Sequence, residues 1–153
     1  MLSKVLALGF LSTCGGGGGG SSDPPLQIEV IWRGVLNQSG ADFAVFAMDV
    51  TTTTSGVVSG NGAIEFYGSG DYVSLSATGS MTSTEIAITL KDAVNDTIII
   101  DARREGDLYR GTWRWPSLSA EGSVRLAAEK NGGLLSVGTM GNPDVTLREA
   151  LGE

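Results

Sequence analysis

The chain contains no histidine and only one cysteine among its 153 residues. Without histidine, neither a Ser-His-Asp triad nor a histidine-bearing zinc site can form. The sequence also lacks the helix–loop calcium motif and the glycine-rich phosphate loop of the Walker type. These absences remove most nucleophilic, metal and phosphate chemistry, so we expect a protein that is not an enzyme and needs no cofactor or metal.

Basic residues are scarce, with 10 Lys and Arg against 17 Asp and Glu and a net charge of −7. Nucleic acid is therefore not an expected partner, because affinity for it comes largely from cations that neutralise phosphates. Long apolar runs are missing as well. The first run, "VLALGFL" at residues 5–11, is far shorter than the roughly 20 residues of a membrane-spanning helix.

The start of the chain combines this short apolar run with a positive charge at Lys4 and then reads Leu11, Ser12, Thr13, Cys14. A charged start and a short apolar core are typical of a secretory signal. An ordinary secreted protein with a stray thiol, or a cytoplasmic protein with an apolar start, is the alternative.

The order Leu11, Ser12, Cys14 resembles the lipobox-type signal of bacterial lipoproteins, with Thr13 departing from the usual Gly, Ala or Ser. The resemblance implies that residues 1–13 are a signal peptide and that Cys14 is acylated, for example with palmitate. It also implies a membrane partner through that anchor and a place in the cell envelope. Because Gly15 rather than Asp follows the cysteine, the outer membrane is favoured in an organism with two membranes.

Residues 14–26 form the expected linker, since "GGGGGGSSDPP" follows the cysteine. Gly and Ser make a flexible coil, and the Asp-Pro-Pro end is stiffer. Such a coil reaches about 17 to 20 Å, so it can hold a small domain clear of a lipid surface.

Residues 27–130 form the expected folded domain, in which apolar and polar residues alternate in short runs separated by turns. This period of two predicts half-buried strands. We predict strands at 27–36, 41–51, 57–67, 72–81, 85–91, 97–104, 108–115 and 120–128. In the second strand, two sets compete for the inward face: Phe43, Val45 and Ala47 against Phe46, Met48 and Val50.

Eight short strands with tight turns predict an all-β, up-and-down antiparallel barrel, with a β-sandwich as the alternative. Glycines on the inward faces suit the close approach of backbones in a small barrel. Charged residues such as Glu29, Arg33 and Arg125 fall on the outward face, which argues against a barrel embedded in lipid.

The segments "IWRGVL", "SGVVSGNG", "ATGSM" and "GTWRW" resemble a small lipocalin-like barrel domain of bacterial lipoproteins. In lipocalins the Trp of the first strand lies under an Arg from the end of the barrel. The resemblance implies that Trp32 and Arg125 are equivalents of that pair, although Val30 occupies the place of the usual Gly.

Residues 131–153 form the expected tail. Asn142 is a good N-cap and Pro143 suits the first helical position, so we predict a short C-terminal helix that carries Leu147 and Leu151 one turn apart. Residues 131–141 form either a loop or a ninth strand.

Aromatic side chains are the candidate ligand-binding residues. An eight-stranded barrel either fills its interior or holds one small ligand. The favoured interpretation is that these side chains pack the core. The more specific interpretation is that they form the walls of an apolar ligand cavity. The candidate set is Trp32, Trp113, Trp115, Phe66 and Tyr109.

Arginines on neighbouring predicted strands have a similar pair of interpretations. Cross-strand pairing with acidic residues is the simpler one, and a basic face toward anionic lipid or polysaccharide is the other. The residues are Arg103, Arg104, Arg110 and Arg114.

We therefore expect an envelope-anchored lipoprotein that acts as a non-enzymatic binding or interaction module. Its barrel would carry a small apolar ligand. The alternative is a structural or accessory lipoprotein whose filled core only presents loops to a partner protein, which the sequence does not identify.

Overall fold

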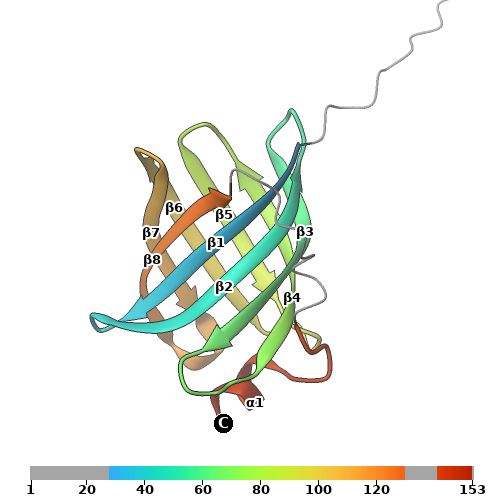
Figure 1. The fold of residues 1–153 in the computed structure, drawn as a ribbon, viewed down its shortest axis with the longest axis vertical. Coiled ribbons are helices and arrows are strands. Elements are labelled where there is room, and N and C mark those ends of the chain that lie inside the picture. The colour runs from blue at the N-terminus through green and yellow to red at the C-terminus, as the bar shows by residue number, and fades with distance from the viewer. Residues whose placement is uncertain (1–27, 130–140, 153) are drawn as a thin grey trace, which may run out of the picture.

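The structure, a computed structural model, describes residues 28–129 and 141–152. Eight antiparallel strands form a closed barrel in sequence order, and β8 pairs with β1 to complete it (Figure 1). The strands are β1 (Ile28–Gln38), β2 (Ala41–Thr52), β3 (Val57–Phe66), β4 (Tyr72–Met81), β5 (Glu85–Lys91), β6 (Thr97–Glu105), β7 (Leu108–Trp115) and β8 (Ala120–Glu129). The predicted up-and-down barrel is confirmed, and the β-sandwich is wrong.

Alternation of apolar and polar residues builds the wall of the barrel. In β5, Ile86, Ile88 and Leu90 are almost fully buried, while Glu85, Ala87 and Lys91, which alternate with them, are exposed. Because successive side chains of a strand point to opposite faces, one face of each strand fills the interior. An interior of eight strands is just wide enough for such side chains to fill.

The second strand uses one of its two candidate faces for the core. Phe46, Met48 and Val50 are buried in the main cluster, so Val45 and Ala47 lie on the outer surface. Phe43 also reaches the core, because a β-bulge interrupts the β1–β2 register. There Leu36 pairs with Ala44 and Asn37 with Asp42, which leaves Phe43 as the extra residue.

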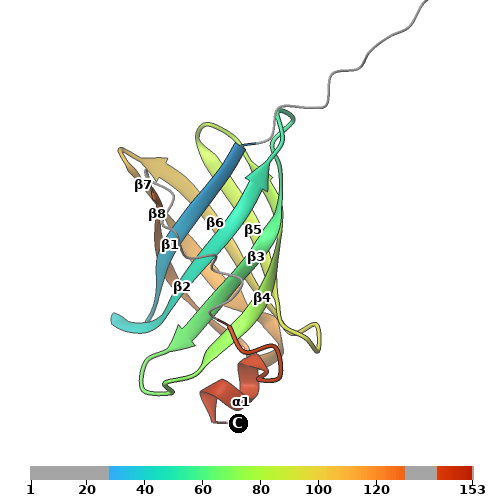
Figure 2. The same cartoon turned by 45° about the vertical axis from the view of Figure 1, so that its right-hand side comes forward.

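A short helix, α1 (Leu147–Leu151), closes one end of the barrel, opposite the end at which β1 begins (Figures 1 and 2). We call this the helix end and the other the far end. Leu147 and Ala150 are buried in the main core cluster, so the apolar side of α1 completes the packing of the helix end. Within the described part of the chain, no helix has the length and apolar character needed to cross a membrane.

The predicted start of this helix is wrong. Thr146 is the N-cap, and its hydroxyl and the Glu149 carboxylate form a reciprocal capping box. Asn142 instead forms a parallel bridge with Val73 of β4, and its side chain accepts a hydrogen bond from the Asp144 backbone. Asn142 therefore pairs with the backbone of β4 instead of capping the helix.

Polar groups attach α1 to the barrel. Asp92, after β5, is buried, and its two carboxylate oxygens accept hydrogen bonds from the backbone of Val94, Asp96 and Leu147. Asp96 accepts hydrogen bonds from Ser117, in the 3₁₀ helix η1 (Pro116–Leu118), and from Arg148 of α1. These contacts hold the first turn of α1 against the turn between β5 and β6.

Three sequence predictions lie outside the described residues. They are the signal peptide at 1–13, the linker at 14–26 with Cys14, and the choice between loop and ninth strand at 131–141, of which only Gly141 is described. They stay predictions.

Candidate functional site

The five candidate aromatic residues lie inside the barrel and belong to one core cluster. Their exposed fractions are 5% for Trp32, 2% for Phe66, 7% for Tyr109, 1% for Trp113 and 0% for Trp115. The structure brings them together in two groups, one toward each end of the barrel.

Stacked rings fill the half of the barrel near the helix end. Trp113 stacks on Phe43 with ring centroids 5.2 Å apart, and Phe66 stacks on Trp115 at 5.7 Å. The indole Nε1 of Trp113 donates to the Asn37 carbonyl at 3.0 Å. The packing and the hydrogen bond account for Phe66 and Trp113 without a ligand.

The other group lies toward the far end, where Trp32 and Tyr109 meet edge to face with centroids 5.3 Å apart. The indole Nε1 of Trp32 is buried and has no hydrogen-bond partner among the described residues. The indole Nε1 of Trp115 is buried and without a hydrogen-bond partner among the described residues in the same way. A buried donor without an acceptor costs free energy, so packing leaves both Trp32 and Trp115 incompletely explained.

The implied pairing of Trp32 with Arg125 is wrong. Trp32 points into the core, whereas Arg125 is exposed and lines the outer surface of β8. In the β1–β8 register, Trp32 faces Ala128 and Arg125 faces Val35. The two side chains leave opposite sides of the barrel wall, because their positions differ in parity along the paired strands.

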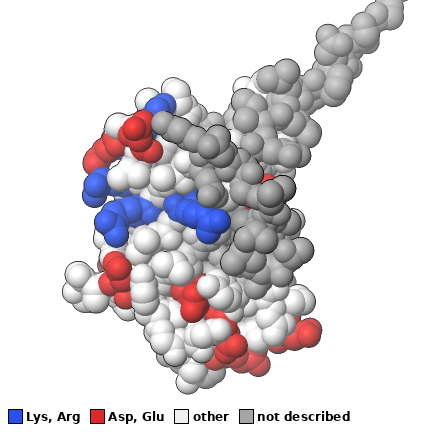
Figure 3. All heavy atoms as spheres, viewed as in Figure 1, with Lys and Arg blue, Asp and Glu red and all other residues white. Residues whose placement is uncertain are grey.

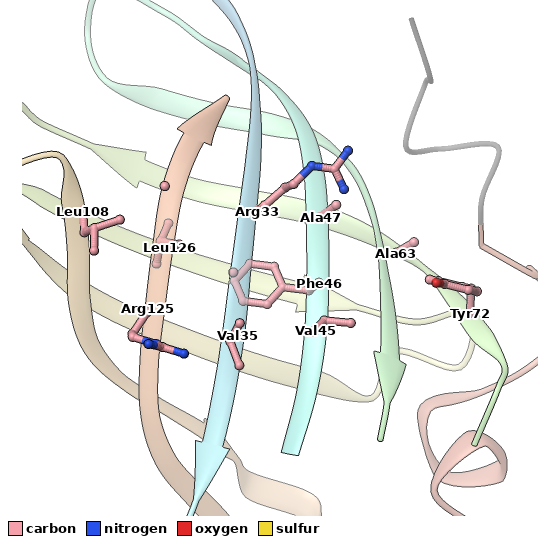
Figure 4. A pocket seen from close by; sticks show the side chains of 12 residues that line it. Arg33, Val35, Val45, Phe46, Ala47, Ala63, Tyr72, Leu108, Arg125 and Leu126 are labelled. Carbon is pink, nitrogen blue, oxygen red and sulfur yellow. The ribbon is translucent and has the colours of Figure 1, made fainter. Parts of the chain in front are cut away.

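A groove of about 460 Å³ runs over the outside of the barrel, mainly across β8, β1, β2 and β3 (Figure 4). We call it the outer groove. Its lining is mostly apolar and consists of Arg33, Gly34, Val35, Val45, Phe46, Ala47, Ala63, Tyr72, Leu108, Arg125, Leu126 and Ala127. Its volume lies in the range of pockets that hold small molecules.

Outward-facing apolar residues on paired strands form the walls of the outer groove. Val35 faces Val45 across β1 and β2, and Ala47 faces Ala63 across β2 and β3. Ala47 and Ala63 also form a second buried apolar cluster with Ile31, separate from the interior core. The barrel thus has apolar packing on part of its outer face as well as inside.

The floor of the outer groove depends on Gly34. A Cβ at this position would lie 2.2 Å from Cζ of Phe46, its cross-strand partner. The Phe46 ring therefore fills the space that a larger residue at position 34 would need. Only glycine lets the ring lie against this part of the wall.

Two arginines provide the charges of the outer groove. Arg125 lies beside Val35, its cross-strand partner, and Arg33 lies two residues away from Val35 on β1, opposite Ala47 (Figure 4). No acidic residue is among the described lining residues. Basic side chains form a band across this face of the molecule, and acidic side chains lie above and below it (Figure 3).

The end of the outer groove on β4 is polar. Tyr72 lies directly across from Glu65, and a hydrogen bond from its hydroxyl to that carboxylate raises the pKa of Tyr72. The hydroxyl therefore stays protonated, and the Glu65 charge is engaged by Tyr72.

The candidate arginines of β6 and β7 follow in part the simpler interpretation, which is pairing with acidic residues. Arg103 pairs with Glu85 at 3.1 Å and Arg110 with Glu105 at 3.3 Å. Arg104 donates to the Gly106 carbonyl at 3.0 Å. Cross-strand and turn contacts with near neighbours therefore engage these three side chains.

The sequence of β2 carries a signal for the outer groove. Apolar residues occupy both faces of β2, which made its inward face ambiguous. A strand that is apolar on both faces needs cover on both faces. The competition between the two sets was therefore itself evidence of a second apolar surface.

Comparison of the chain with models of protein families, with curated proteins and with solved structures finds no match. The resemblances to bacterial lipoproteins and to lipocalin-like barrels therefore stay predictions from the sequence.

Proposed function

We propose that the chain is an envelope-anchored lipoprotein whose barrel is a non-enzymatic binding module, and that it binds at the outer groove. The anchor rests on the lipobox-like order around Cys14 and on the linker that follows it. The outer groove is the observation that carries the binding role, since a largely apolar concavity with few charged groups is typical of ligand sites.

The packing of the interior supports the outer surface as the binding surface. Trp113 and Trp115 are at most 1% exposed, and α1 closes one end of the barrel. A ligand in that half would have to displace stacked rings. Truncating a buried Trp typically costs about 3–5 kcal/mol, so displacing these rings is expected to be costly as well.

Transport of a small apolar ligand inside the barrel is the second candidate function. The buried Nε1 of Trp32 supports it, because a ligand acceptor near Tyr109 would satisfy this donor. Titration of the full chain with apolar ligands would then shift the tryptophan fluorescence. An unchanged spectrum across a broad panel would contradict this candidate.

The anchor is tested by the change Cys14→Ala in a bacterial host that processes lipoproteins. The variant should lose metabolic labelling with palmitate and leave the membrane fraction, because it lacks the thiol that carries the acyl chain. Cys14→Ser removes the same thiol and should behave alike. Palmitate labelling that persists in either variant would show that the lipoprotein assignment is wrong.

Binding at the outer groove is tested by photo-crosslinking in cells. A photoreactive residue replaces Val35 in the groove or, as the matched control, Thr112, which is exposed on the outer face of β7. We expect crosslinked products from position 35 and few from position 112. Equal products from the two positions, or none from position 35, would contradict the groove as the binding site.

A further inference from the structure

We infer that the outer groove binds a fatty-acid carboxylate, with the acyl chain across β1, β2 and β3 and the carboxylate beside Arg125. This inference rests on the proposed function and names the ligand class of the same site. Its grounds are the apolar walls, the charge of the rim and the span of the groove.

The charge of the rim indicates an anion. Arg103, Arg110 and Arg125 lie directly side by side in the registers of β6, β7 and β8. Like charges at directly opposed positions destabilise a sheet unless counter-charges lie nearby. Glu85 and Glu105 pair with the first two arginines.

Arg125 is the member of this row without such a counter-charge. No ion pair or hydrogen bond joins its side chain to another residue in the described ranges 28–129 and 141–152, and it is exposed at the rim. The Arg125 rim is thus positive in a chain whose net charge is −7.

The walls indicate that the rest of the ligand is apolar. Beyond Arg125, the apolar outward residues of the groove are Val35 and Val45 in the row of Arg125, and the buried Ala47 and Ala63 in the row of Arg33. None of these four apolar side chains can form a hydrogen bond, so a sugar or a peptide backbone would lose its bonds to water beside them. A hydrocarbon chain loses none.

The span of the groove fits a chain of moderate length. From β8 to β3 there are three gaps between neighbouring strands, about 14 Å at 4.7–4.9 Å each. An extended carbon chain advances about 1.3 Å per bond, from C–C bonds of about 1.5 Å. A chain of ten carbons, about 12 Å long, therefore reaches from Arg125 across β1 and β2 and most of the way to β3.

The test compares three ten-carbon probes by calorimetric titration of the full chain carrying Cys14→Ala, each below its micelle concentration. The probes are decanoate, 1-decanol and decyltrimethylammonium. Decanoate should bind about 1.4- to fivefold more tightly than decanol, the range that one exposed ion pair supplies. Decyltrimethylammonium should bind most weakly.

Two pairs of variants locate the site. Arg125→Gln should remove the preference for decanoate, while Arg114→Gln, which changes an exposed arginine of β7, should keep it. Val45→Glu should weaken decanoate binding at least tenfold, while Val57→Glu at an exposed valine of β3 should not. Far-ultraviolet circular dichroism checks that each variant is folded. If Val45→Glu does not fold, the comparison of Arg125→Gln with Arg114→Gln decides whether the site is at Arg125.

The outcomes separate the two proposals. Equal affinities for decanoate and decanol, lowered only by Val45→Glu, overturn carboxylate recognition and leave the outer groove as a binding site. Equal weakening by Val45→Glu and Val57→Glu overturns both. If no probe binds, the fatty-acid inference is wrong, and the crosslinking experiment alone decides the proposed function.

Discussion

Gly122 illustrates how a single missing side chain permits the aromatic core. It lies directly across the β7–β8 pair from Trp113. A Cβ at Gly122 would lie 1.9 Å from the Asn37 carbonyl oxygen and 2.8 Å from Nε1 of Trp113. These two atoms are the partners of a 3.0 Å hydrogen bond, so the glycine leaves the space in which that bond forms.

The change Gly122→Ala should therefore destabilise the barrel by about 1–3 kcal/mol, the usual cost of overpacking. The direction is informative, because alanine in a strand is otherwise favoured over glycine by roughly 0.5–1 kcal/mol. Urea unfolding measures the free energy. Ser123→Ala, at the exposed neighbour, is the control and should change it little. A variant at position 122 as stable as the control would contradict the packing described for Trp113.

At the scale of elements, the attachment of α1 depends on ionised carboxylates. Burial raises the pKa of Asp96, but hydrogen bonds outweigh this effect, led by the one from Ser117 and including one from Arg148, and the net pKa is lowered. A hydrogen bond from the Thr146 backbone likewise lowers the pKa of Glu149 in the capping box. Both groups favour the folded state only when they are ionised.

The stability that Asp96 provides should consequently be present above its ordinary pKa of 3.8 and be lost as the pH falls through the lowered folded value. Unfolding free energies of the wild type and of Asp96→Asn, measured between pH 6 and pH 2.5, check this. The wild type should lose more stability below about pH 4 than the variant, which has no charge to lose at this position. Parallel curves would mean that the Asp96 contacts contribute nothing to folding.

The strands were predictable from the sequence because each element follows a simple rule. Period-two alternation and tight turns give the bounds of β4, β5 and β7 without error. The start of α1 was not predictable in this way. Asn142 and Thr146 are both good N-caps by residue type, and only the bridge of Asn142 to Val73 decides between them.

The candidate site also has some features that the sequence predicts and others that it does not. Burial of Trp113 and Trp115 follows from their alternation, so their place in the core was expected. The bulge that adds Phe43 to that core has no signal in the sequence, since it depends on the β1–β2 register. The outer groove as a whole was not predictable from the sequence either, because Arg125 and Val35 become neighbours only when β8 pairs with β1.

At the scale of the whole molecule, the barrel has two apolar regions with different roles in our account. The interior is packed with aromatic rings and closed by α1, and it stabilises the fold. The outer groove is largely apolar, has Arg125 exposed at its rim and lies on the outer face of the barrel. In the proposed arrangement, the linker after Cys14 separates the start of the barrel from the membrane by about 17 to 20 Å on average.

The most direct test of this account is a methyl NMR titration of the full chain carrying Cys14→Ala with decanoate. Methyl groups of Val35 and Val45 report on the outer groove, and those of Ile88 and Ile100 report on the filled interior. The account predicts concentration-dependent shifts at the two valines and unchanged signals from the two isoleucines. Shifts at Ile88 and Ile100 with unchanged signals at Val35 and Val45 would contradict it, because they would place the ligand inside the barrel.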